Sequence, residues 1–74
     1  MQKWEYVFAE AELSWGTWCV RYENGQEIAN WKKMYPSVYA NEVGKRGWEL
    51  VSVAFHDSDG GSHYYRLFFR RPVE

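Results

Sequence analysis

The chain has 74 residues, 20% of them aromatic, and its nine basic and ten acidic residues leave a formal charge of -1. This balance argues against generic binding to a phosphate backbone, which depends on clustered positive charge. A chain of this length forms one domain, residues 1–74, and buries only about 60% of the surface that its unfolded form exposes. Aromatic side chains left outside such a core would form an exposed apolar surface, so self-association is the first hypothesis.

A single cysteine and the absence of long apolar runs indicate where the protein resides. Cys19 has no internal partner for a disulfide, so the sequence is not typical of a disulfide-stapled secreted domain. We find no basic-then-apolar N-terminal segment, and no apolar run approaches the ~20 residues of a membrane helix. We therefore expect a cytoplasmic protein with no membrane partner.

The first part of the chain alternates apolar and polar residues, a pattern that predicts strands. Residues 3–11 form the first predicted strand, and residues 13–16 connect it to a second one over residues 17–23. One face of the first strand would carry Trp4, Tyr6 and Phe8. In the second, Trp18, Val20 and Tyr22 would share a face, opposite Cys19, Arg21 and Glu23.

A tight hairpin turn and a helix are predicted next. Asn24 and Gly25 both tolerate the positive φ of a type I′ turn, and residues 26–31 would form a short return strand. Pro36 suits the first turn of a helix over residues 37–46, and Gly47 can take the left-handed conformation that ends it. The apolar stripe of this helix would consist of Tyr35, Val38, Tyr39 and Val43.

Two further strands complete the pattern. Residues 48–55 carry apolar side chains on both faces, which predicts a strand in the centre of its sheet. Residues 56–62 have the composition of a loop, and residues 63–71 predict the last strand. We therefore expect an α+β fold, with a small antiparallel sheet of four to five strands and one covering helix in the order β-β-(β)-α-β-β.

Few residues point to chemistry. Asp57-Ser58-Asp59-Gly60 resembles the start of a calcium loop, but the twelfth position holds Phe68 instead of glutamate. His56 and His63 bracket this loop and are only weak metal candidates. Cys19, Ser52 and Ser62 are possible nucleophiles, yet nothing sets one of them beside a base and an orienting group. We expect no enzymatic activity, no cofactor and no metal.

The last strand interleaves rings with guanidinium groups on one face. Such a surface could stack the bases of a single-stranded nucleic acid, and it serves equally as a subunit interface, where Tyr, Trp, Phe and Arg are enriched. The charge balance favours the interface, and a core-facing or plain surface role stays open. The candidate ligand or interface residues are Trp18, Tyr22, Trp31, Tyr64, Arg66, Phe68 and Arg70.

Three segments together resemble a known family. These are Trp4-Glu5-Tyr6, the junction from Gly44 to Val53 with its Gly-Trp-Glu-Leu-Val-Ser-Val run, and Phe69-Arg70-Arg71-Pro72. The chain resembles the small bacterial and phage domain of unknown function numbered 4177. The resemblance does not cover residues 15–31. It implies strand pairs around one helix and carries no activity.

These observations leave three functional hypotheses. The first is a non-enzymatic module that forms a homodimer or higher oligomer through an aromatic sheet face. The second is a small-ligand or nucleotide-binding protein, such as a phage-encoded sequestering protein, with its site between subunits. The third is single-stranded nucleic-acid binding on Tyr64, Arg66 and Phe68.

Overall fold

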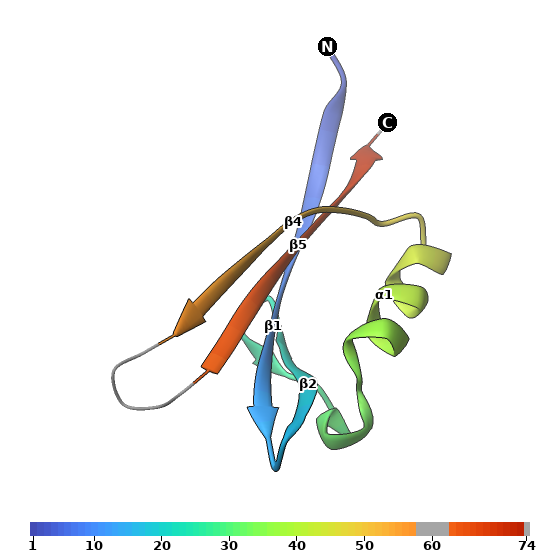
Figure 1. The fold of residues 1–74 in the computed structure, drawn as a ribbon. Helices are drawn as coiled ribbons and strands as arrows, with labels where there is room; N and C mark the ends of the chain where they lie inside the picture. The colour runs from blue at the N-terminus through green and yellow to red at the C-terminus, as the bar shows by residue number, and fades with distance from the viewer. Residues whose placement is uncertain (58–62, 74) are drawn as a thin grey trace.

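A five-stranded antiparallel sheet and one α-helix make up the fold, as predicted (Figure 1). The structure is a computed structural model that describes residues 1–57 and 63–73. The strand order is β3-β2-β1-β5-β4, and α1 lies against one side of the sheet. The elements are β1 (Lys3–Ser14), β2 (Thr17–Glu23), β3 (Gln26–Glu27), the 3-10 helix η1 (Trp31–Lys33), α1 (Pro36–Lys45), β4 (Glu49–Asp57) and β5 (His63–Val73).

The two long strands β1 and β5 form the centre of the sheet. They pair from Lys3 opposite Val73 to Glu12 opposite Tyr64, so the two ends of the described chain lie side by side (Figure 1). The prediction that residues 48–55 form a central strand is wrong, because β4 is an outer strand that pairs with β5. Apolar residues on both faces do not distinguish a covered central strand from an exposed edge strand.

The hairpin between β1 and β2 is tighter than the sequence indicated. β1 continues to Ser14, and only Trp15 and Gly16 form the turn, with φ of 53° and 79°. Gly16 takes this conformation without strain, whereas a bulky residue such as Trp15 rarely does. The predicted connection over residues 13–16 is therefore wrong in its first half.

A β-bulge in β2 changes which residues share a face. Glu10 pairs with Tyr22 and Ala11 pairs with Val20, so Arg21 is the extra residue between two pairs. Val20 therefore faces α1, whereas Tyr22 points to the other side of the sheet. The predicted grouping of Trp18, Val20 and Tyr22 on one face is wrong beyond Val20.

The return strand is shorter than predicted. The turn at Asn24-Gly25 has φ of 50° and 83°, as expected, but β3 contains only Gln26 and Glu27. Asn30 then takes φ of 60° and η1 begins, so Trp31 lies in a helical turn and not in a strand. This segment remains bound to β2, because Ile28 N–H donates to the Arg21 carbonyl (2.8 Å) and Val20 N–H donates to the Met34 carbonyl (2.7 Å).

Helix α1 spans Pro36–Lys45, one residue earlier than the predicted range 37–46, with Pro36 in its first turn and Gly47 after its end at φ of 90°, as predicted. Gly47 N–H donates to the Gly44 carbonyl, and Trp48 N–H donates to the Val43 carbonyl (3.2 Å), which satisfies the last turn. Of the predicted stripe, only Tyr39 and Val43 are buried, and Tyr35 and Val38 stay more than 40% exposed. The core cluster consists of Val7, Ala9, Ala11, Val20, Tyr39, Val43, Leu67 and Phe69.

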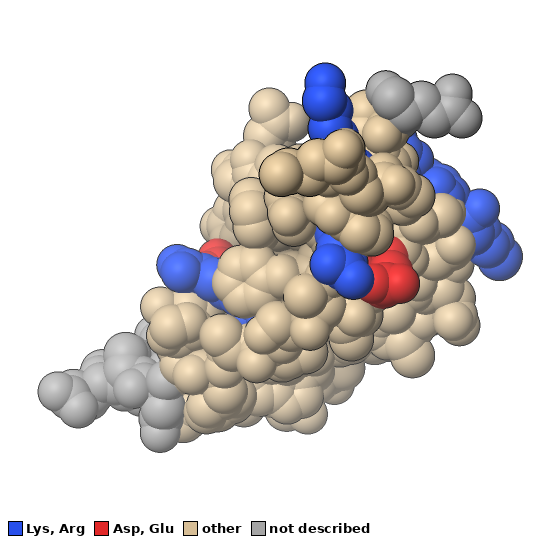
Figure 2. All heavy atoms as spheres, turned by 90° about the horizontal axis from the view of Figure 1, so that it is seen from above, with Lys and Arg blue, Asp and Glu red and all other residues tan. Residues whose placement is uncertain are grey.

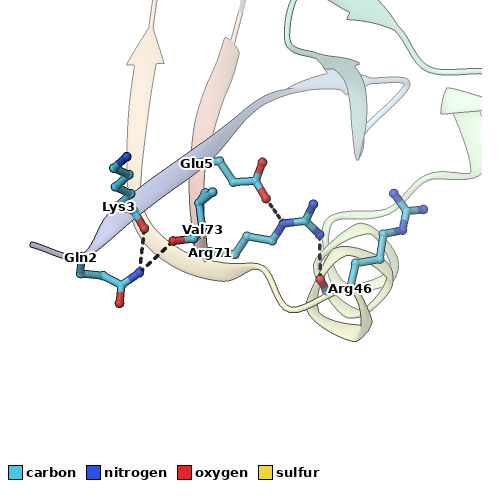
Figure 3. Close-up of polar contacts among 6 residues, drawn as sticks. All are labelled: Gln2, Lys3, Glu5, Arg46, Arg71 and Val73. Atoms are coloured by element: carbon cyan, nitrogen blue, oxygen red, sulfur yellow. Dashed lines mark hydrogen bonds and ion pairs between the residues drawn. The ribbon is translucent and has the colours of Figure 1, made fainter.

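Arg71 connects the end of α1 to the two central strands (Figure 3). Its Nε donates to the Glu5 carboxylate on β1, and its Nη1 donates to the Arg46 carbonyl at the helix end (3.0 Å). The guanidinium carbon also lies 4.3 Å from the centre of the Trp48 ring. One side chain therefore bonds both β1 and the last turn of α1 to β5.

Candidate interaction surface

The sheet face turned away from α1 carries six of the fifteen aromatic residues of the chain. Along β1, Val7 and Ala9 are buried towards the helix, so the intervening side chains project to the opposite side. We call this side the open face. It is built by β1, β2, β4 and β5, and its aromatic residues are Trp4, Tyr6, Phe8, Tyr22, Tyr64 and Phe68.

Rings on the open face form a continuous stripe across β1 and β5. Phe8 lies directly opposite Phe68 in the strand register, and the two rings meet edge to face at 5.5 Å. Tyr6 stacks beside Phe8 with ring centres 6.4 Å apart. Trp4, Tyr6 and Phe8 nevertheless remain 37%, 52% and 50% exposed, so this stripe has contact surface that the chain itself does not cover.

The charged groups of the open face are paired within the chain. Arg66 Nε lies 3.5 Å from Glu10 Oε1, and Arg70 Nε donates to Glu49 Oε1 at 3.0 Å. The Arg70 guanidinium also lies 4.1 Å from the centre of the Trp4 ring. Seen from above the view of Figure 1, Lys and Arg side chains are scattered over this end of the molecule, and two of these basic groups lie beside acidic ones (Figure 2). The open face therefore combines exposed rings with little unbalanced charge.

A shallow cleft of about 390 Å³ lies where the open face crosses from β5 to β2. Phe8 and Tyr22 supply its rings, and the Glu10–Arg66 ion pair supplies its polar groups. Gly25 lines it at the β2–β3 turn, where the lack of a side chain leaves room. The cleft thus offers aromatic surface beside one acidic and one basic group.

Arg21 organises the rim of the open face near β3. Its Nη1 donates to Glu12 (2.6 Å) and its Nε donates to Glu27 (3.0 Å). The hydrogen bond that Arg21 donates to Glu12, and then the one that it donates to Glu27, raises the pKa of the Arg21 guanidinium above its ordinary value. The guanidinium carbon lies 4.4 Å from the centre of the Trp31 ring, which fixes η1 beside β2.

The structure brings five of the seven predicted residues together. Tyr22, Tyr64, Arg66, Phe68 and Arg70 all lie on the open face. The other two lie elsewhere. Trp18 packs on the helix side, with its ring 4.8 Å from that of Tyr65, and Trp31 lies at the rim under Arg21.

The sequence prediction omitted the most exposed rings of the stripe. Trp4, Tyr6 and Phe8 were placed on one strand face but were not included among the candidates. The signal was present, since three aromatic residues alternate along one strand. What was lacking was the neighbouring strand, because only the β1–β5 pairing sets Phe8 against Phe68.

The two histidines lie on neighbouring strands and point to opposite faces of the sheet. His56 is opposite Tyr64, and their rings stack at 5.0 Å, whereas His63 is opposite Asp57 in the next register position. Asp59 of the calcium-like pattern and Ser62 lie outside the described residues. Over residues 1–57 and 63–73, no group of three or more His, Cys, Asp or Glu side chains could hold a metal ion.

The surroundings of Cys19 are those of a buried structural residue. It is 3% exposed, and its thiol donates to the Lys32 carbonyl at 3.4 Å, which joins β2 to η1. Ser52, another possible nucleophile, lies opposite Phe68 on the open face.

No helix in the described part of the chain is long and apolar enough to cross a membrane. Comparisons with family models, with curated proteins and with solved structures gave no match.

Proposed function

We propose that the protein is a non-enzymatic, homo-oligomerising interaction module that associates through the open face of its sheet. The observation that carries this proposal is the stripe of Trp4, Tyr6 and Phe8, each at least 37% exposed and continuous with Phe68. A surface of this kind marks a site for a partner, because burying its rings supplies most of the free energy of association.

A second copy of the chain fits this surface well. The acidic and basic groups of the open face are already paired within one chain, so two such faces can approach without excess like charge. Two sheets also pack stably face to face, with their inner side chains interdigitated. Such packing would add apolar burial to a chain whose own core is small.

Replacing one ring at the centre of the stripe tests the proposal. Phe8→Glu places a charge opposite Phe68 and should convert the oligomer formed through this face into a smaller species. The measurement is molar mass by size-exclusion chromatography with light scattering at micromolar concentration, with circular dichroism to verify folding. Tyr35→Glu is the matched control, because Tyr35 is a 45% exposed ring away from the open face. A monomeric wild-type protein would disprove the proposal.

The cleft beside Phe8 and Tyr22 favours a second function, the binding of a small ligand or nucleotide. Its two rings could stack on a planar group, and Arg66 could exchange Glu10 for an anionic group of the ligand. In a thermal-shift screen, a nucleotide or cyclic dinucleotide should then raise the melting temperature of the wild-type protein but not that of Arg66→Gln. If no compound of that panel raises the melting temperature, this proposed function is wrong.

Single-stranded nucleic-acid binding is the third and weakest proposal. It is supported by the alternation of Tyr64, Arg66 and Phe68 on the open face, and it is weakened by the pairing of Arg66 with Glu10. Salt-sensitive binding of a labelled oligonucleotide is the expected sign. Absence of binding at low salt would end this proposal.

A further inference from the structure

The two edges of the sheet differ in how well they are protected from pairing with a strand of another chain. At one edge, β3 contains only Gln26 and Glu27, and residues 28–34 continue along β2 through the hydrogen bonds of Ile28 and Val20. At the other edge, β4 is nine residues long and pairs with β5 on one side. Within the described residues no element pairs with its outer side. An edge strand of this length presents a row of backbone donors and acceptors.

The side chains of β4 do not shield this edge. Residues 50–55 contain no charged residue and no proline, two of the features that hinder pairing with another chain, and the bulge in β4 is confined to Val51 near its start. Four apolar side chains are about half exposed along the strand. They are Leu50 (48%), Val51 (51%), Val53 (53%) and Phe55 (60%).

Part of this exposed surface belongs to the face that α1 was expected to cover. Val53 lies opposite Leu67 and Phe55 lies opposite Tyr65, so both side chains point to the helix side. Leu67 is 5% exposed, whereas its neighbour Val53 is 53% exposed. The helix therefore covers the central strands and leaves β4 open.

We infer that β4 pairs antiparallel with β4 of a second copy around a two-fold axis, joining two five-stranded sheets into one of ten strands. A register centred on Ala54 matches both faces. It sets Val53 opposite the partner's Phe55 on the helix side of the joined sheet. Ser52 then lies opposite the partner's His56 on the other side.

The chemistry of β4 favours a second copy over an unrelated strand. In this register Ala54 meets Ala54 and Val53 meets Phe55, whereas Ser52 lies opposite His56 and Val51 lies opposite Asp57. Glu49 lies beyond the paired stretch, so no two acidic residues are opposed within it. A charged partner strand would find no opposite charge between residues 50 and 55. Every strand in the described part of the chain is already in the sheet, so none remains to cover β4 from within.

Edge pairing is independent of the open face, because it uses the backbone of β4 and not the aromatic stripe. Both contacts can form at once, and the wild-type particle should then contain more than two chains. Val53→Lys should reduce it to the dimer held by the open face, because lysine on an edge strand prevents pairing. Val38→Lys is the matched control, since Val38 is a 42% exposed valine on α1. It should leave the molar mass unchanged.

Light scattering of the wild-type protein, the two single variants and the double variant distinguishes the open-face contact from the edge contact. Phe8→Glu should leave a dimer joined through β4, and the double variant Phe8→Glu with Val53→Lys should be monomeric. If Val53→Lys keeps the wild-type molar mass, the edge contact is wrong and the open-face proposal stands. If Phe8→Glu keeps the wild-type molar mass, the open-face proposal fails and the edge contact stands.

A crosslink tests the register directly. Residues at the two-fold centre of an antiparallel pair have Cβ atoms about 4.5–5.5 Å apart, close enough for a disulfide after a small shift. In a Cys19→Ala background, Ala54→Cys should therefore form a covalent dimer under mild oxidation, seen on a non-reducing gel. Ala29→Cys is the control, since Ala29 is exposed near the opposite edge. Equal crosslinking of the two variants would overturn the register, and no crosslinking of Ala54→Cys would overturn the pairing.

Discussion

Tyr39 shows how one side chain joins the helix to the sheet. Its ring is 3% exposed and meets Phe69 edge to face at 5.8 Å, and its hydroxyl donates to Glu23 on β2 at 2.6 Å. Burial of the phenol, and then its hydrogen bond to Glu23, raises the pKa of Tyr39 above its ordinary value of about 10. The bulge in β2 makes this contact possible, because it turns Glu23 towards the helix.

The raised pKa of Tyr39 predicts a loss of stability at alkaline pH. Below pH 10 both states hold the proton. Above it the unfolded state releases the proton while the folded state keeps it, so the free energy of unfolding falls as pH rises. In Tyr39→Phe this decline should be less steep, by up to about 1.4 kcal/mol per pH unit. Urea unfolding between pH 9 and pH 12 measures it, with Tyr35→Phe as the control. Equal slopes in Tyr39→Phe and wild type would contradict the assignment.

At the scale of elements, the junction between α1 and β4 depends on two glycines with different roles. Gly44 lies inside the helix, whereas Gly47 follows it with φ of 90°. Apart from the adjacent residues and the backbone of the helix itself, a Cβ added at either position meets no atom within 4 Å. Any effect of alanine at these positions therefore comes from the backbone and not from crowding.

The two glycines predict opposite effects of substitution by alanine on the free energy of unfolding. Gly44→Ala should raise the free energy of unfolding by about 1 kcal/mol, because alanine loses less conformational entropy in a helix. Gly47→Ala should lower it by about 1–2 kcal/mol, because the left-handed conformation brings a Cβ too close to the following carbonyl. Chemical denaturation of both variants measures these changes, and a shift of the same sign in both would refute the explanation.

Local sequence signals predicted the elements themselves better than they predicted which elements lie beside one another. The Asn24-Gly25 turn, the start of the helix at Pro36 and its end at Gly47 each follow from residues adjacent in sequence, and all three are confirmed. The bulge at Arg21 and the early end of β3 were missed. Both result from contacts with other elements, namely the β1 register and the hydrogen bonds of residues 28–34 with β2.

The whole molecule has a small core for its surface. Among the described residues nine apolar side chains are buried, and three of them, Ala9, Ala11 and Cys19, are small. If the open face and β4 bind further copies, folding and assembly are coupled, and the melting temperature depends on protein concentration.

Thermal unfolding of the wild-type protein should show this dependence. Across a 100-fold range of concentration, the melting temperature should rise by about 5 °C or more, since each tenfold step contributes about 1.4 kcal/mol to a dimer. The double variant Phe8→Glu with Val53→Lys should melt at a temperature that does not change with concentration. A concentration-independent wild type would argue against both contacts.

The amino-acid sequence by itself determined the α+β class, the turn at Asn24-Gly25 and the end of the helix at Gly47. It also determined the aromatic alternation that gives one sheet face its rings. These features depend on backbone preferences and on period-2 patterning, which adjacent residues encode. The resemblance to the domain of unknown function numbered 4177 stays a prediction, as does its implied lack of assigned activity.

Only the tertiary structure decided which strands are neighbours. Pairing β1 with β5 joins residues up to 70 positions apart, sets Phe8 against Phe68 on the open face and moves β4 from the expected centre to the edge. Alternation reports which side chains share a face of one strand, but it carries no information about which strand lies beside it. The same residues, Leu50 to Phe55, would be core in a central strand and are an exposed surface in this one.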